Sequence, residues 1–220
     1  QPLILVAEDS TFFRKQVVKY IENAGFQVIA GEDGEAAWNL LIEAIEKFRT
    51  YHLEMEIQAT DSYDISSSGN NLSRTYEEIY SEVDMLLETY VHEYGYFDAY
   101  LICEAHGHVM YTHEREADLG ENLSFGQYKE SHLAEVWSKA IKEDKSVLVD
   151  FAAYAPSGGI ASMFAGVPVY NGEKMIGVFV VQINSKQLNS IVQERTGMGK
   201  TGESYLVGTD IDGMTSLRSD

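Results

Sequence analysis

Five stretches in the second half of the chain alternate between apolar and polar residues, and this pattern constrains the fold most. They cover residues 97–104, 109–113, 146–154, 160–170 and 175–184. Turn sequences separate them, and the clearest is the Asn-Gly pair that precedes the last stretch, which is typical of a two-residue hairpin. Alternation at period two indicates strands with one buried face. The sequence therefore predicts a five-stranded antiparallel sheet.

Two helices are expected to pack on this sheet. The longer one carries a wide apolar stripe and ends at Gly95, with Asn71 or Ser73 as its N-cap. The shorter one covers residues 131–143. The 14 tyrosines of the chain suit a helix–sheet interface, because their rings are apolar and their hydroxyls are polar. A long helix on an antiparallel sheet gives the α+β class.

The first forty residues follow a different pattern. Residues 3–7 form a continuous apolar run, typical of a strand that is buried on both faces of a parallel sheet. A helix over residues 11–24, a strand over 26–30 and a second helix from Glu35 to about Thr60 are expected next. The order strand–helix–strand–helix opens a doubly wound α/β fold.

Composition narrows the classes of function. Acidic residues outnumber basic ones 35 to 16, and the formal charge is −19, which argues against binding to nucleic acid or to an anionic lipid surface. The single cysteine, Cys103, excludes an intrachain disulfide and a zinc site built from cysteines. No apolar run is long enough to span a membrane. We expect no cofactor.

Residues 3–42 combine an apolar strand that ends in Glu8-Asp9, a Gly-Phe strand start and a Glu-Asp-Gly turn. In this order they resemble the first third of a response-regulator receiver domain. In that family the acidic pair binds Mg²⁺ beside a phosphoaccepting aspartate, so the resemblance implies Glu8 and Asp9 as metal ligands. Residues 41–48 read as helix where the phosphoacceptor strand should follow. The metal site is therefore expected to be incomplete, and a receiver in a phosphorelay is the disfavoured alternative.

Five blocks follow one another in residues 73–220: YGYFDAYLICEAHGHVMYTHEREADLGENL, SHLAEVWSKAI, VDFAAYAPSGGIASMFAGVPV, IGVFVVQINSKQLNSIV and RTGMGKTGESYLVGTD. Together they resemble the Cache sensor domains of bacterial chemoreceptors and sensor kinases. The resemblance implies a PAS-like sheet that binds a small molecule without catalysis and signals through the preceding long helix. Amino-acid-binding members have an Arg-Trp-Tyr block before the third strand, which residues 130–137 lack. The class of ligand therefore stays open.

The two resemblances divide the chain into four segments. We expect a partial receiver-like unit in residues 1–42, a helical linker in 43–72, a sensor module in 73–195 and the start of a second Cache module in 196–220. Residues 40–45 mark a junction between two signalling fragments. The downstream signalling domain is expected outside this chain, and a homodimer through the long helix is an open possibility. The compartment also stays open, because receivers work in the cytoplasm and Cache modules usually outside it.

Polar residues on otherwise apolar strands predict the ligand site, because a small-molecule cavity needs a few converging polar groups. The candidates are Tyr111, His113, Asp150, Tyr154, Ser162 and Gln182. Alternation puts Tyr111 and His113 on one side of their strand. In the same way, Asp150 and Tyr154 are expected to share a side. A carboxylate within an apolar strand is costly unless it has a partner, so Asp150 either receives a ligand ammonium or bonds to a loop amide.

Two other kinds of site have weaker support. A metal site is conceivable where four potential ligands gather across one hairpin: Glu104, His106, His108 and His113. Histidines within a turn are more commonly solvated, however. A hydrolase would need Ser157 as its nucleophile, but no Gly-x-Ser-x-Gly motif surrounds that serine. The sequence therefore favours a ligand sensor over an enzyme.

Overall fold

The computed structural model describes residues 3–7, 27–31, 34–68, 72–185, 189, 192, 205–209 and 214–217. Five strands form an antiparallel sheet in the order β4–β3–β7–β6–β5. They are β3 (Asp98–Ile102), β4 (Val109–Thr112), β5 (Val147–Tyr154), β6 (Ile160–Asn171) and β7 (Lys174–Asn184). The predicted sheet and the α+β class are confirmed.

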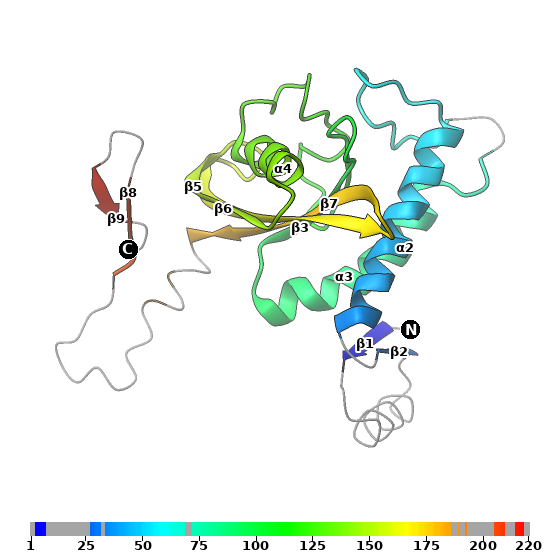
Figure 1. The fold of residues 1–220 in the computed structure, drawn as a ribbon, viewed down its shortest axis with the longest axis horizontal. Helices are drawn as coiled ribbons and strands as arrows, with labels where there is room; N and C mark the ends of the chain where they lie inside the picture. The colour runs from blue at the N-terminus through cyan, green and yellow to red at the C-terminus, as the bar shows by residue number, and fades with distance from the viewer. Residues whose placement is uncertain are drawn as a thin grey trace.

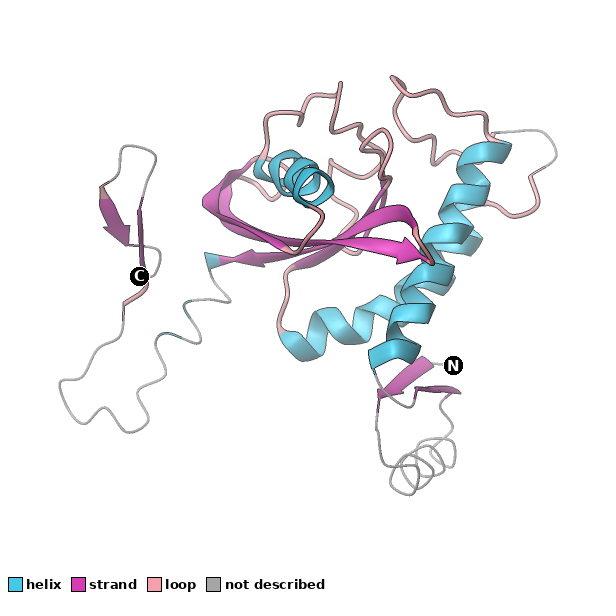
Figure 2. Cartoon of the chain, viewed as in Figure 1, coloured by secondary structure: helices cyan, strands magenta, loops and turns pink. Residues whose placement is uncertain are grey.

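Helices cover both faces of this sheet (Figure 1). They are α2 (Gly34–Glu54), α3 (Tyr76–Tyr94) and α4 (His132–Glu143). The α4 helix lies on one face, and its buried residues pack with Tyr100, Phe164 and Val180 of the sheet. The α2 and α3 helices pack on the other face, where they form a second apolar cluster. Figure 2 shows the long loop that joins β4 to α4 on the α4 side.

Two short pairs of strands complete the described residues. β1 (Leu3–Ala7) and β2 (Gln27–Gly31) pair in parallel, as the sequence predicts. β8 (Val207–Thr209) and β9 (Thr215–Leu217) pair antiparallel. The predicted helix over residues 11–24 and the candidate metal ligands Glu8 and Asp9 lie outside the described residues. The part of the chain that the structure describes gives no further support to the receiver resemblance.

The sheet face under α2 and α3 is filled with aromatic side chains. Phe48 of α2 and Tyr76 of α3 are fully buried, with ring centroids 5.8 Å apart. The tyrosine hydroxyls end on backbone carbonyls: Tyr63 donates to Phe48 O at 2.7 Å, and Tyr76 donates to Met110 O at 3.0 Å. These rings therefore fill the core while their polar tips stay hydrogen-bonded, as expected from the tyrosine content.

The α2 helix is part of this core. The sequence predicts helix to about Thr60, but α2 ends at Glu54, and Glu56 has a left-handed backbone with φ of 53°. Ile45 and Phe48, which the sequence places at a junction and in a linker, are fully buried. The division of the chain into domains stays a prediction.

The ends of α3 are set by local hydrogen bonds. Its N-cap is Thr75, not Asn71 or Ser73: the Thr75 hydroxyl accepts from Glu78 N at 3.3 Å, and the Glu78 carboxylate accepts from Thr75 N at 2.8 Å. Gly95 ends the helix in a left-handed conformation, as predicted.

The apolar stripe of α3 is largely used by the core, which bears on the predicted homodimer. Its buried residues are Tyr76, Ile79, Tyr80, Val83, Leu86, Leu87 and Val91. The large apolar residues that α3 exposes are Met85 and Tyr94. The homodimer stays a prediction. None of the helices in the described ranges has the length and apolar character that a membrane crossing requires.

Candidate ligand-binding site

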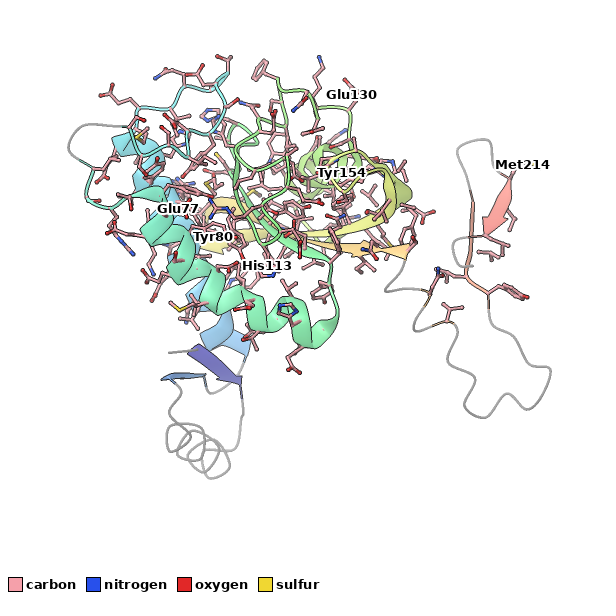
Figure 3. All side chains as sticks on the ribbon, turned by 180° about the vertical axis from the view of Figure 1, so that it is seen from behind. Glu77, Tyr80, His113, Glu130, Tyr154 and Met214 are labelled. Carbon is pink, nitrogen blue, oxygen red and sulfur yellow. The ribbon has the colours of Figure 1, made fainter. Side chains whose placement is uncertain are left out.

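Three of the six candidate residues lie together on the α4 side of the sheet. Tyr154 of β5, Ser162 of β6 and Gln182 of β7 are all buried. Gln182 pairs with Phe164 in the sheet, and Ser162 lies two positions before Phe164 on the same strand. Because side chains alternate along a strand, Ser162, Phe164 and Gln182 face the same side. Figure 3 shows Tyr154 next to α4.

The Gln182 amide is the centre of a buried hydrogen-bond network. Its Oε1 accepts from the Tyr100 hydroxyl at 2.5 Å. Its Nε2 donates to Ser157 Oγ at 3.0 Å and to Ser162 Oγ at 2.8 Å. The Ser157 hydroxyl in turn donates to Glu116 Oε2 at 2.5 Å. The network thus connects three strands of the sheet with the loop between β4 and α4, and it occupies Ser157, the serine of the rejected hydrolase.

That loop also contributes Asp118, which is fully buried. Its Oδ2 accepts from the Tyr154 hydroxyl at 2.5 Å, whereas its Oδ1 has no hydrogen-bond partner in the described part of the chain. Burial raises the pKa of Asp118 to about 6, and the negative charge of Glu116 acts in the same direction. An unpartnered carboxylate oxygen therefore lies beside the Tyr154 hydroxyl and near the charge of Glu116.

A second buried carboxylate, Asp98, begins β3 and faces the same side. Its Oδ1 accepts from the backbone N–H groups of Ala99 and His113, at 2.7 and 2.8 Å, and its Oδ2 accepts from the Thr112 hydroxyl. Burial nevertheless raises the pKa of Asp98 to about 7, and the charge of Asp118 contributes to the rise. The two aspartates thus disfavour each other's ionisation.

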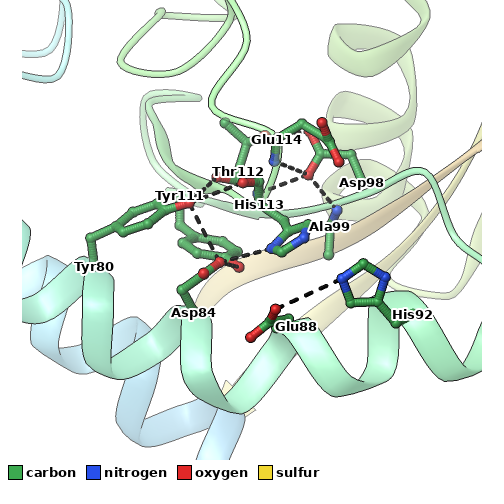
Figure 4. A network of polar contacts seen from close by, with 10 residues as sticks. All are labelled: Tyr80, Asp84, Glu88, His92, Asp98, Ala99, Tyr111, Thr112, His113 and Glu114. Carbon is green, nitrogen blue, oxygen red and sulfur yellow. Dashed lines mark hydrogen bonds and ion pairs between the residues drawn. The ribbon is translucent and has the colours of Figure 1, made fainter. Parts of the chain in front are cut away.

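Tyr111 and His113 lie in a different network, on the α3 side of the sheet (Figure 4). The Tyr111 hydroxyl donates to Asp84 Oδ1 of α3 at 2.7 Å, and His113 Nδ1 lies 2.8 Å from the same oxygen. The hydrogen bond to Asp84 raises the pKa of His113 above its ordinary value. Burial acts to raise the pKa of Asp84, but these two hydrogen bonds lower it overall. Neither candidate belongs to the Gln182 network.

The expectation that Asp150 faces inward is wrong. A β-bulge between Val149 and Ala152 interrupts the pairing of β5 with β6, so simple alternation fails at this point. Asp150 is exposed, and its Oδ1 accepts from its neighbour Phe151 N at 2.7 Å. Tyr154, beyond the bulge, is buried.

Asp98, Asp118 and Glu116 are the residues that the sequence interpretation missed. Asp98, like Asp150, is a carboxylate in an otherwise apolar strand, so the argument used for Asp150 also applies to Asp98. The buried Asp118 and the half-buried Glu116 lie in a loop without periodicity, so no pattern marks them as part of a site.

A cavity of about 310 Å³ lies on the opposite face of the sheet. Most of its lining is apolar and comes from the C-terminal half of α3 and the strands below it, including Leu87, Val91, Val167, Phe179 and Val181. Its lining residues with polar side chains are Tyr90, Tyr94, Tyr96 and Ser146, with no carboxylate, amide or cationic group to orient a small ligand. The Gln182 network is therefore the stronger candidate.

Comparison with known proteins gives only distant likenesses. No family model matches the chain, and no curated protein matches it. Among solved structures, it is similar to the sensor domain of the V. cholerae histidine kinase DctB, with 18% identity and a TM-score of 0.40. That match covers 71% of this chain and 59% of the DctB chain.

Two chemoreceptor domains give matches of the same kind. The ligand-binding domain of the Pseudomonas aeruginosa amino acid chemoreceptor PctC, in complex with GABA, is 11% identical over 96% of this chain and 77% of its own, with a TM-score of 0.43. The Campylobacter jejuni Tlp3 domain with L-norvaline is 17% identical over 84% and 65%, with a TM-score of 0.41. Because these TM-scores are low, the function proposed below rests on the residues of this chain.

Proposed function

We propose that the chain is a sensor module that binds a small amine on the α4 side of the sheet. The observation that carries this proposal is the carboxylate of Asp118, which is fully buried with its Oδ1 unpartnered among the described residues. A buried polar group without a partner costs about 1–3 kcal/mol. A ligand ammonium at Oδ1 would supply the missing donor. The proposal agrees with the Cache resemblance of residues 73–220.

The charge of the cluster supports a cationic ligand. Asp98, Asp118 and Glu116 lie around one network, and none of the ion pairs formed by the described residues includes any of the three. Carboxylates without an ion-pair partner attract an ammonium and repel a free carboxylate. The ligand is therefore an amine without a free carboxylate rather than an amino acid, which suits a chain that lacks the Arg-Trp-Tyr block.

The same cluster is connected to α3 through His113. Its backbone N–H donates to Asp98 on the ligand side, and its ring bonds to Asp84 of α3. Tyr80 of α3 adds hydrogen bonds from its hydroxyl to the carbonyls of Thr112 and His113, at 3.2 and 3.0 Å. We propose that a ligand that bonds to Asp98 and Asp118 shifts the C-terminal end of β4. The shift would reach α3 through the hydrogen bonds of His113 and Tyr80.

Binding can be tested by thermal shift with matched pairs of compounds. Primary amines such as ethanolamine and putrescine are expected to raise the melting temperature, because a ligand that binds only the folded chain stabilises it. Matched alcohols and carboxylic acids without the amine are expected to have no effect. Asp118→Asn should weaken the binding of an active amine by about 10- to 100-fold, the range for a hydrogen bond to a charged group.

Glu130→Gln is the matched control for Asp118→Asn. It removes one carboxylate from the same loop, but Glu130 is exposed, so amine affinity should be unchanged. Stabilisation by the carboxylic acids instead of the amines would contradict the amine proposal. Equal affinity of wild type and Asp118→Asn for an active amine would remove Asp118 from the site.

The connection to α3 can be tested by hydrogen exchange. An active amine is expected to change exchange in both β7 and α3 of the wild-type chain. In His113→Ala the change in β7 should remain and the change in α3 should be lost. Glu93→Gln is the control, since Glu93 is an exposed residue near the same end of α3. A full α3 response in His113→Ala would contradict the proposed connection.

A further inference from the structure

Three histidines from two distant parts of the chain meet at the end of α2. His52 lies in the last turn of α2, and His106 and His108 lie in the turn that joins β3 to β4. The ring centroids are 5.1 Å apart for His52 and His108, 5.5 Å for His106 and His108, and 6.1 Å for His52 and His106. Each ring offers a nitrogen that lies within 4.8 Å of the other two.

Hydrogen bonds prepare His108 as a ligand. Its Nε2 lies 3.0 Å from the carbonyl oxygen of Asp61, and because a carbonyl only accepts, Nε2 carries the proton. The lone pair is then on Nδ1, which is buried and has no partner in the described ranges. A metal-binding histidine usually donates its other N–H to a carbonyl or carboxylate in this way.

The other two rings are also available. Nδ1 of His106 is buried and without a hydrogen-bond partner in the part of the chain that is described. The His52 ring interacts with the backbone of Ile57, and one of its nitrogens lies close to those of His106 and His108.

The surroundings leave room for one more ligand. A cavity of about 150 Å³ lies beside the rings, and Arg49, His52, Glu104 and His106 are among the residues that line it. The Glu104 carboxylate is held by Arg49 at 2.6 Å, so it is not free to bind a cation. A water molecule or a small external ligand would take the fourth position from the cavity side.

We propose that His52, His106 and His108 bind one Zn²⁺-like transition-metal ion, with a fourth position that opens to this cavity. Imidazole suits zinc, copper and nickel, and three protein ligands with one open position form a common zinc geometry. Zn–N bonds of about 2.1 Å place tetrahedral ligand atoms roughly 3.4 Å apart, so small ring rotations complete the site. The ion would join the C-terminal end of α2 to the β3–β4 turn.

The site differs from the one that the sequence suggested. His106 and His108 are shared, but Glu104 pairs with Arg49 and His113 bonds to Asp84 on α3. His52 replaces them. The site is also separate from the Gln182 network, so it does not depend on the proposed amine function.

The test uses the purified chain, stripped with EDTA, and ZnCl₂ or CoCl₂ as the only probe. Calorimetry should show one Zn²⁺ per chain, Zn²⁺ should raise the melting temperature, and Co²⁺ should give the intense visible absorption of a four-coordinate ion. His52→Ala and His106→Ala should each weaken Zn²⁺ binding more than 10-fold and abolish that absorption. Both side chains are only half-buried, so the variants are expected to fold, and circular dichroism without metal checks this.

His92→Ala and His132→Ala are the controls, since they remove histidines elsewhere in the chain. Both should bind Zn²⁺ as the wild type does. Zn²⁺ affinity that is unchanged in His52→Ala and His106→Ala, or lost equally in the two controls, would overturn the site. So would a wild-type chain that binds neither Zn²⁺ nor Co²⁺.

Discussion

Replacing Phe48 with alanine is expected to lower the free energy of unfolding by about 3–5 kcal/mol, the usual cost of truncating a buried aromatic side chain. The Phe48 ring of α2 is fully buried against α3 and the sheet. Its centroid lies 5.8 Å from that of Tyr76 and 6.2 Å from that of Tyr111. The Tyr76 and Tyr111 hydroxyls are hydrogen-bonded to Met110 O and Asp84. The Tyr76 and Tyr111 rings cannot move into the space left by Phe48 without breaking those hydrogen bonds. Relaxation of the core therefore recovers little of the lost free energy.

Leu53→Ala is the matched control on the same helix. The Leu53 side chain is 76% exposed, so its truncation should change the free energy of unfolding by less than about 0.5 kcal/mol. Urea denaturation of the full chain, followed by circular dichroism, measures both variants. Equally small losses would mean that α2 is a linker, as the sequence suggests. The expected contrast would show that α2 and the sheet unfold together.

The sheet could be predicted because its signals are local. Period-two alternation and turn residues such as Asn171-Gly172 depend on neighbours in sequence, and each predicted strand end lies within two residues of the observed one. The place of α2 could not be predicted, since residues 43–60 show only a partial apolar face. What buries Ile45 and Phe48 is contact with α3 and the sheet, which lie far away in sequence.

The candidate site was predicted only in part, because some of its residues have a local signal in the sequence and others do not. The sequence marks Ser162 and Gln182 as polar residues on otherwise apolar strands, and the structure joins them by a hydrogen bond on one face. Alternation failed at Asp150, because a bulge of the strand leaves no mark in the residue pattern. The buried Asp118 comes from a loop, where burial depends on tertiary contacts alone. His52 illustrates the extreme case, since it lies more than 50 residues from the histidines that it meets.

The free energy of unfolding is expected to fall by about 4 kcal/mol as the pH rises from 5 to 7.5. Burial raises the pKa of Asp98 to about 7 and that of Asp118 to about 6, from an ordinary value of 3.8. Each carboxyl therefore holds its proton more tightly in the folded chain than in the unfolded one. The resulting stability is complete below the unfolded pKa and is lost as the pH rises through the folded pKa. One pKa unit corresponds to about 1.4 kcal/mol.

Asp118→Asn should reduce this fall to about half. The variant removes one titrating group, and it also removes a charge that raises the pKa of Asp98. The hydrogen bond to Asp84 raises the pKa of His113, so its contribution to the free energy of unfolding also falls as the pH rises. This contribution is present in both proteins and cancels in the comparison. Glu130→Gln should keep the full wild-type fall. Denaturation with urea at a series of pH values measures all three proteins.

The affinity of an amine ligand should change with pH in the direction opposite to the stability of the free chain. The ligand ammonium is attracted by ionised Asp118 and not by the neutral acid, so its affinity should increase as the pH rises through about 6. The free chain thus loses stability in the pH range where the ligand gains affinity, because the same uncompensated charge causes both effects. Calorimetric titration with an active amine at pH 5 and 7.5 checks this. Amine affinity that does not change with pH in the wild type would place the ammonium away from Asp118, and the case for a cationic ligand would then lose its main support.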